Sequence, residues 1–268
     1  MTSLVSRLGR AVWTAYEYAA MVLGLGALAL LCLGWLPWAL LGAVLPPRAG
    51  RFVGRVAIMV GFRLYLHFLA IFCACRFDLS ALDSLRRDQP LILVANHPSL
   101  LDVVMIVSRL PNAVCVMKAS LMDNILLGAA ARLARYIRND APVSMVRRAR
   151  AALQQGAHLV IFPEGSRTLH FPVDACTNAA GLIASNARVP LQALIIEFSS
   201  PYLGKAWPLF RKPELPLRFR IRLGRRFEAP AHIRNFTGEL EDYFRREMST
   251  SADGPAPPGN PNCESAAP

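Results

Sequence analysis

The feature that most constrains this chain is an uncharged run near its N-terminus, because residues 18–47 contain no Asp, Glu, Lys or Arg. A helix needs about 20 apolar residues to cross the hydrocarbon core of a bilayer, and this run is longer. It is also too long for a signal peptide, and no convincing small-residue cleavage site leads into a secreted-looking domain. Gly34, Pro37 and Gly42 interrupt the run, which leaves a straight span, a bent helix and a shallow hairpin open. The run predicts a membrane segment.

A second apolar stretch, residues 56–75, contains Arg63 and His67. A charged side chain in the middle of a segment is costly in lipid, so this stretch is expected to be an interfacial or partly buried helix. Basic residues flank the first run on both sides, and the downstream cluster is slightly richer and joins a basic domain. We therefore expect the protein at the cell membrane, with the domain that follows these segments on the cytoplasmic side. The downstream cluster is Arg48, Arg51 and Arg55.

The overall charge restricts the partners of the chain. Hydrophobic residues make up 54% of the 268, and the formal net charge is +12. This balance suits anionic partners such as membrane lipid or phosphorylated substrates. No nucleic acid partner is expected, because no helix-turn-helix, zinc-finger or RNA-binding signature accompanies the charge. The 6 cysteines form no Cys-x-x-Cys pair and have no His at metal spacing, so we expect reduced thiols and no metal.

From Leu82 onward, apolar strand patterns alternate with helical patterns. Such alternation predicts an α/β domain, a central mixed sheet flanked by helices on both faces. Strands are expected at residues 91–95, 113–117, 135–138, 158–162, 190–197 and 217–223. Helices are expected at residues 99–110, 121–133, 144–155, 178–187 and 233–247. We expect membrane-associated helices over residues 1–80, the α/β domain over 81–248 and a disordered tail over 249–268.

Two of the expected strands end in polar residues that carry chemistry. The strand at 91–95 leads into Asn96 and His97, with Asp102 five positions after His97. An imidazole is a suitable base near neutral pH, and a carboxylate on its donor nitrogen would fix the tautomer and stabilise the imidazolium. Ser99-x-x-Asp102 is also a capping-box pattern. The alternative to a catalytic pair is therefore that Asp102 only caps the helix and that His97 is an ordinary loop histidine.

The second strand end is far less common by chance. The apolar run that starts at Leu159 ends in Phe162-Pro-Glu-Gly-Ser-Arg-Thr168, and Gly165 would let the backbone approach a ligand closely. Arg167 offers a planar fork of donors to phosphate. A carboxylate beside a phosphate would repel it, so Glu164 is expected to orient Arg167 or Arg138, or to accept a hydrogen bond from an acceptor hydroxyl. A buried Arg–Glu pair that only holds the loop is the alternative.

Together with Lys118 to Arg138 and Val189-Pro-Leu191, these stretches resemble the 1-acyl-glycerol-3-phosphate acyltransferase family, the lysophospholipid acyltransferases, over about residues 85–225. The resemblance implies an O-acyltransferase that uses an acyl-CoA or acyl-ACP thioester and has no permanently bound cofactor. It also implies a helical pair seated in one leaflet. The implied partners are membrane lipid, a lysophospholipid acceptor and, for the ACP donor, an acyl carrier protein. The implied catalytic residues are His97 and Asp102, and the implied glycerol-phosphate ligands are Arg138, Glu164, Gly165, Ser166 and Arg167.

The sequence departs from the family at two points. The segment from Phe171 to Ala180 lacks the usual Lys and Gly, and Val189-Pro-Leu191 is not followed by the usual second proline. The acceptor is therefore open between lysophosphatidic acid, an ornithine lipid, a glycolipid and a carrier-bound product. A non-catalytic lipid-binding adaptor is a rival function. A transacylase or lysophospholipase is another, although no Gly-x-Ser-x-Gly supports the hydrolase.

Overall fold

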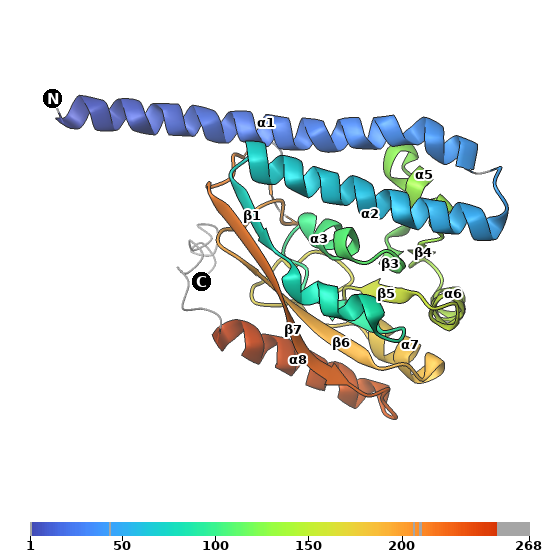
Figure 1. The fold of residues 1–268 in the computed structure, drawn as a ribbon. Helices are drawn as coiled ribbons and strands as arrows, with labels where there is room; N and C mark the ends of the chain where they lie inside the picture. The colour runs from blue at the N-terminus through green and yellow to red at the C-terminus, as the bar shows by residue number, and fades with distance from the viewer. Residues whose placement is uncertain (1, 43, 206, 209–210, 251–268) are drawn as a thin grey trace, which may run out of the picture.

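The computed structural model describes residues 2–42, 44–205, 207–208 and 211–250, so most of the expected tail lies outside the described residues. Two N-terminal helices precede an α/β domain (Figure 1). Its strands are β1 (Cys75–Asp78), β2 (Ile92–Ala95), β3 (Ala113–Met117), β4 (Ile137–Arg138), β5 (His158–Ile161), β6 (Leu191–Phe198) and β7 (Leu217–Phe227). Its helices are η1 (Ser80–Arg87), α3 (Leu101–Arg109), α4 (Ala119–Asp123), α5 (Ile125–Leu133), α6 (Pro142–Gln154), α7 (Ala179–Ala187) and α8 (Ile233–Thr250).

The strands form one mixed sheet in the order β1-β7-β6-β2-β5-β3-β4. Strands β6, β2, β5, β3 and β4 are parallel, β7 is antiparallel to β6, and β1 is parallel to β7. The carboxyl ends of β2 and β5 therefore meet at one edge of the sheet, where the segment between β6 and β7 also begins. Ligands of open α/β sheets bind at this kind of edge.

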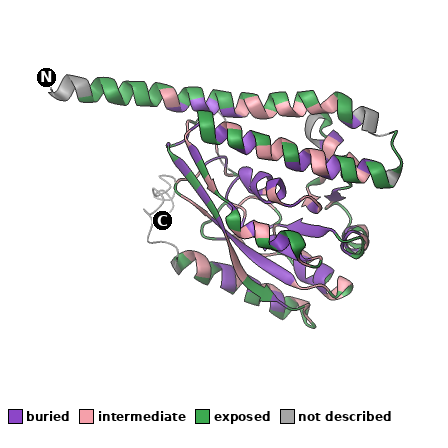
Figure 2. Ribbon diagram, viewed as in Figure 1, coloured by how far each residue is buried: buried purple, intermediate pink, exposed green. Residues whose placement is uncertain are grey.

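Helices cover both faces of the sheet, as the alternation predicted. On one side α2 packs on α3, and on the other α6, α7 and α8 pack on one another and on the strands. The central strands are buried throughout, whereas the helices show exposed outer surfaces (Figure 2). Strands buried on both faces read as continuous apolar runs, which is why β2 and β5 were visible in the sequence.

Helix α1 (Thr2–Gly42) is one continuous helix of 41 residues that contains Pro37, which excludes the hairpin alternative. It runs antiparallel to α2 (Pro47–Phe72), as Figure 1 shows. The hydroxyl of Tyr16 donates to the Phe72 carbonyl at 3.1 Å, and that of Tyr65 donates to the Gly24 carbonyl at 3.2 Å. Both helices are long and apolar enough to cross a membrane by length and composition.

Polar side chains attach this helical pair to the α/β domain. Glu17 of α1 is buried, forms an ion pair with Lys212 and accepts the backbone N–H of Leu215 at 3.2 Å. Arg63 of α2 donates Nε and Nη2 to the carbonyl of Ser108, at the end of α3, at 3.3 and 3.1 Å. The expected partly buried helix at residues 56–75 is confirmed for α2, because the domain accepts the hydrogen bonds of its arginine.

Several element boundaries differ from those expected. Strand β1 lies before residue 81, yet it pairs with β7 and so belongs to the sheet. Only two residues separate β1 from the end of α2, so the sequence pattern did not distinguish its four residues from the end of an apolar helix. The expected helix at 121–133 is divided at Asn124 into α4 and α5, and β7 continues to Phe227 rather than residue 223.

Candidate active site

The turn after β2 is held in place by a side chain that forms the same two hydrogen bonds with β6 that a strand backbone would form. The amide of Asn96 donates Nδ2–H to the Ile196 carbonyl at 3.0 Å and accepts the Ile196 N–H at Oδ1 at 2.8 Å. This exchange extends the pairing of β2 with β6 by one step after the backbone has left the ladder. It fixes the direction in which His97 leaves the sheet.

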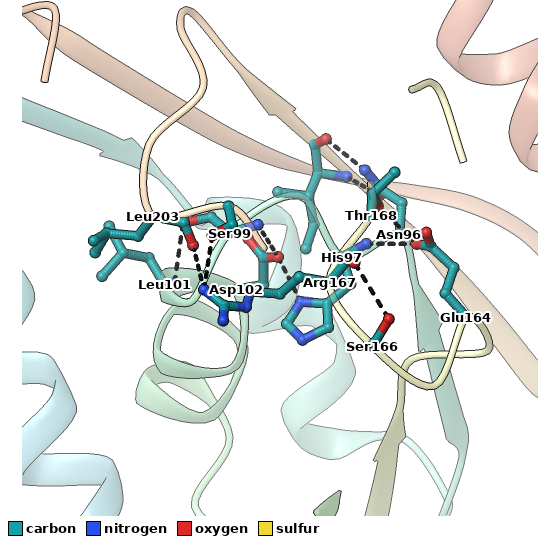
Figure 3. A network of polar contacts seen from close by, with 12 residues as sticks. Asn96, His97, Ser99, Leu101, Asp102, Glu164, Ser166, Arg167, Thr168 and Leu203 are labelled. Carbon is teal, nitrogen blue, oxygen red and sulfur yellow. Dashed lines mark hydrogen bonds and ion pairs between the residues drawn. The ribbon is translucent and has the colours of Figure 1, made fainter. Parts of the chain in front are cut away.

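His97 and Asp102 meet as the sequence predicted. The distance between His97 Nδ1 and Asp102 Oδ2 is 2.8 Å, and the two side chains face each other in Figure 3. Asp102 lies in the first turn of α3 and is fully buried, while the side chain of His97 is 16% exposed. The same Oδ2 accepts the Ser99 N–H at 2.8 Å, and Ser99 Oγ accepts the Leu101 N–H at 3.2 Å. The capping pattern and the His–Asp pair therefore coexist in one carboxylate.

The surroundings of His97 leave one of its two ring nitrogens without a partner among the described residues. Nδ1–H donates to Asp102, and Nε2 has no hydrogen-bond partner among the described residues. The ring stacks on Phe162 with centroids 3.8 Å apart and 15° between planes, which restricts its rotation. Burial raises the pKa of Asp102, while the His97 ring, the Ser99 amide and the charge of Arg167 oppose this shift. The available Nε2 can accept a proton.

The structure corrects the expectation for Glu164. Its Oε1 accepts the His97 N–H at 2.9 Å and the Thr168 hydroxyl at 3.0 Å, and its Oε2 accepts the Asp174 N–H at 3.0 Å. Within the described part of the chain it pairs with neither Arg167 nor Arg138, so both the orienting role and the Arg–Glu pair are wrong. Burial raises the pKa of Glu164, and these three donors oppose the shift. Glu164 joins the turn after β5 to the turn after β2.

The rest of that turn faces the same edge of the sheet. Gly165 has φ +71°, a conformation that favours glycine, and its N–H donates to the Phe162 carbonyl at 3.0 Å. Ser166 Oγ accepts a hydrogen bond from Lys205 Nζ at 3.1 Å. Arg167 uses Nη1 on the carbonyls of residues 203 and 204, and its Nε and Nη2 have no acceptor among the residues that the structure describes.

Arg138 lies apart from this cluster. It ends β4, which is two strands from β5 at the same edge of the sheet. Its Nε contacts Asp140 at 2.7 Å and its Nη1 contacts Asp123 at 2.5 Å. These two carboxylates outnumber its single positive charge, so its role toward a phosphate stays a prediction.

Sequence reasoning missed the segment that borders this site from the β6 side. Ser99 Oγ donates to the Tyr202 carbonyl at 2.8 Å, and the Leu100 N–H donates to the Leu203 carbonyl at 3.1 Å. These residues lie about a hundred positions downstream of the turn they contact, and they carry no motif. Only the folded sheet brings them together.

Comparison with known proteins agrees with this geometry. A family model described as acyltransferase matches residues 76–197. No curated protein sequence matches the chain. The crystal structure of the 1-acyl-sn-glycerophosphate (LPA) acyltransferase PlsC from Thermotoga maritima is similar in fold, with a TM-score of 0.67 and 17% sequence identity over 90% of this chain and 99% of that one. Residues 76–197 therefore resemble the acyltransferase family, as the motifs predicted.

Proposed function

We propose that the protein is a membrane-bound O-acyltransferase that moves a fatty acyl group from an acyl-CoA or acyl-ACP thioester to the hydroxyl of a lysophospholipid-like acceptor, of the 1-acyl-glycerol-3-phosphate type. The observation that carries this proposal is the pair formed by His97 and the buried Asp102, with Nε2 available beside a turn that carries Arg167 and is contacted by Lys205. The acyltransferase family match supports the reaction type.

In the proposed mechanism, His97 acts as the general base. Its Nε2 takes the proton of the acceptor hydroxyl as that oxygen attacks the thioester carbonyl carbon. Asp102 keeps Nδ1 protonated and stabilises the imidazolium that forms. When the tetrahedral intermediate collapses, the carbon–sulfur bond breaks and the imidazolium returns its proton to the leaving thiolate. The acceptor attacks directly, so no enzyme nucleophile is required.

We assign the acceptor's head group to the turn at residues 164–167. Glu164 holds this turn against the backbone of His97, which fixes the distance between a bound head group and the base. Gly165 allows close approach of the backbone, and Ser166 presents a hydroxyl. Arg167 retains Nε and Nη2 for an anion, and Arg138 would contribute from β4 only in competition with its two aspartates.

The helical pair supports delivery of the acceptor from a membrane. Its outer surface exposes large apolar side chains, which two helices of a soluble domain would normally bury. The segment between β6 and β7 contacts Ser99 through Tyr202 and Glu17 of α1 through Lys212. Helix α3, which carries Asp102, packs on α2 of the pair. We infer that the pair is seated in one leaflet on the cytoplasmic side. The exposed side chains include Val12, Val22, Leu30, Phe52, Leu64 and Ile71.

The seating has its own test in vesicle flotation. Replacing Leu30 and Leu64 together by Asp places two charges on the exposed apolar surface, and we expect the protein to leave the vesicle fraction. Val143→Asp is the matched control, because Val143 is 85% exposed on α6 and lies outside the pair. Unchanged flotation of the double variant would contradict the seating.

The reaction is tested with purified protein in vesicles that contain lysophosphatidic acid, supplied in turn with acyl-CoA and acyl-ACP. Mass spectrometry should detect one phosphatidic acid for each thiol released. The adaptor function predicts no acylated product with either thioester. The lysophospholipase function predicts free fatty acid without a thioester. Either result would refute the proposal, and a panel with ornithine lysolipid and lysoglycolipid acceptors identifies the best acceptor.

A further inference from the structure

The segment of residues 202–205 forms a wall of the candidate site and is held there by several independent contacts. Its carbonyls accept hydrogen bonds from Ser99 Oγ, from the Leu100 N–H and from Arg167 Nη1, the last at 2.8 and 2.9 Å (Figure 3). A Cβ at Gly204 would lie 3.4 Å from the Pro98 carbonyl oxygen, so the segment runs close to the turn that carries His97.

The backbone of this wall is strained at one residue. Leu203 has φ +54°, in the left-handed region that residues with a Cβ rarely adopt. Such a conformation costs about 1–3 kcal/mol and persists where surrounding contacts impose it. Two of those contacts, from Leu100 and Arg167, end on the Leu203 carbonyl itself. The wall is therefore a fixed part of the site.

The wall places one cation beside the turn at residues 164–167. The ammonium of Lys205 lies 3.1 Å from Ser166 Oγ, and its side chain is exposed. No carboxylate among the described residues forms an ion pair with it. The other cations of the site are partly committed, since Arg167 holds the wall through Nη1 and Arg138 lies between two aspartates.

We propose that Lys205 is a specificity-determining residue, whose ammonium binds the phosphate of the acceptor beside Ser166 and thereby selects phosphorylated acceptors over neutral ones. This inference rests on the proposed function. An ammonium is a compact charge with three donors, which suits a phosphate monoester, and the preformed position avoids the entropy cost of ordering a long side chain. Arg167 acts here as a positioning residue, because its Nη1 holds the wall in place. Its Nε and Nη2 remain available to an anion.

The test compares two acceptors that differ in the phosphate, lysophosphatidic acid and 1-monoacylglycerol, in vesicles of fixed phosphatidylglycerol content. For Lys205→Met we expect kcat/KM for lysophosphatidic acid to fall about tenfold, through KM, with kcat/KM for monoacylglycerol unchanged. Lys205→Arg should retain most of the selectivity. Arg147→Met is the control of equal charge change, because Arg147 is exposed on α6 without an ion pair in the described chain, and it should leave both values unchanged.

The possible failures are distinguishable. If wild type acylates lysophosphatidic acid and Lys205→Met keeps the same preference for it, the role of Lys205 is refuted while the proposed function stands. The role of Lys205 is also refuted if Lys205→Met lowers kcat/KM for both acceptors equally, or if Arg147→Met reduces the selectivity as much as Lys205→Met does. If wild type acylates no acceptor of the panel, the proposed function is refuted and this inference with it.

Discussion

Replacing Asp102 by Asn removes one charge from the candidate site while keeping its shape. The Asn oxygen can still accept Nδ1–H of His97 and the Ser99 N–H, both 2.8 Å from Oδ2. The new NH2 group takes the position of Oδ1, which already has no hydrogen-bond partner in the described structure. We therefore expect the tautomer of His97 and the fold of the turn to persist, and only the stabilisation of the imidazolium to be lost.

The size of the effect follows from the distance between the two groups. Two unit charges 2.8 Å apart attract by about 6 kcal/mol at an effective dielectric constant of about 20. If about half of the charge has developed in the transition state, the loss is roughly 3 kcal/mol, a fall in rate of at least about 10²-fold. General-base catalysis as a whole contributes about 10²- to 10⁴-fold, which sets the upper limit.

The assay is the initial rate of thioester-dependent acylation of lysophosphatidic acid, measured with thermal unfolding of the same preparation. We expect kcat to fall within that range and the melting temperature to change little. The double variant with His97→Ala should be no slower than His97→Ala alone, because the two residues act as a unit. A loss of kcat smaller than about tenfold in a folded Asp102→Asn protein would refute the reasoning.

Two further predictions concern the surroundings of the site. Gly165→Ala meets no steric obstacle, since its Cβ would lie 3.7 Å from Thr177. At φ +71°, however, the alanine should lower the free energy of unfolding by about 1–2 kcal/mol and the melting temperature by a few degrees. An unchanged melting temperature would contradict this. Burial lowers the pKa of His158, whose Nδ1 accepts the Leu91 N–H, so below about pH 6.5 the unfolded chain binds a proton that the folded chain does not. Stability should therefore fall as the pH drops from 7.5 to 5.5, and His158→Asn, which keeps an acceptor for Leu91, should reduce this fall in thermal unfolding; an equal fall in both proteins would contradict the assignment.

The sheet and the His–Asp pair were predictable because local patterns determine them. Strands buried on both faces are continuous apolar runs, and His97 and Asp102 lie five positions apart, in the turn before α3 and in the first turn of α3. The same carboxylate completes a capping contact with Ser99, so local propensity and chemistry favour the same geometry.

The partners of the charged groups were not predictable, because they depend on contacts between distant segments. Glu164 was expected to pair with an arginine, yet its carboxylate accepts hydrogen bonds from backbone N–H groups of two other turns. Lys205 comes to Ser166 only because β6 lies beside β2 in the sheet. Strand β1 escaped prediction because its pairing with β7 spans most of the chain.

The central claim is that His97 removes a proton from an attacking hydroxyl, and His97→Ala tests it most directly. The matched control is His170→Ala, since His170 also pairs with a carboxylate, at 3.0 Å from Asp174, but its side chain is 82% exposed. Mass spectrometry of the acylated product should show a fall of about 10²- to 10⁴-fold for His97→Ala and little change for His170→Ala. Acyl transfer at the wild-type rate by a folded His97→Ala protein would contradict the account.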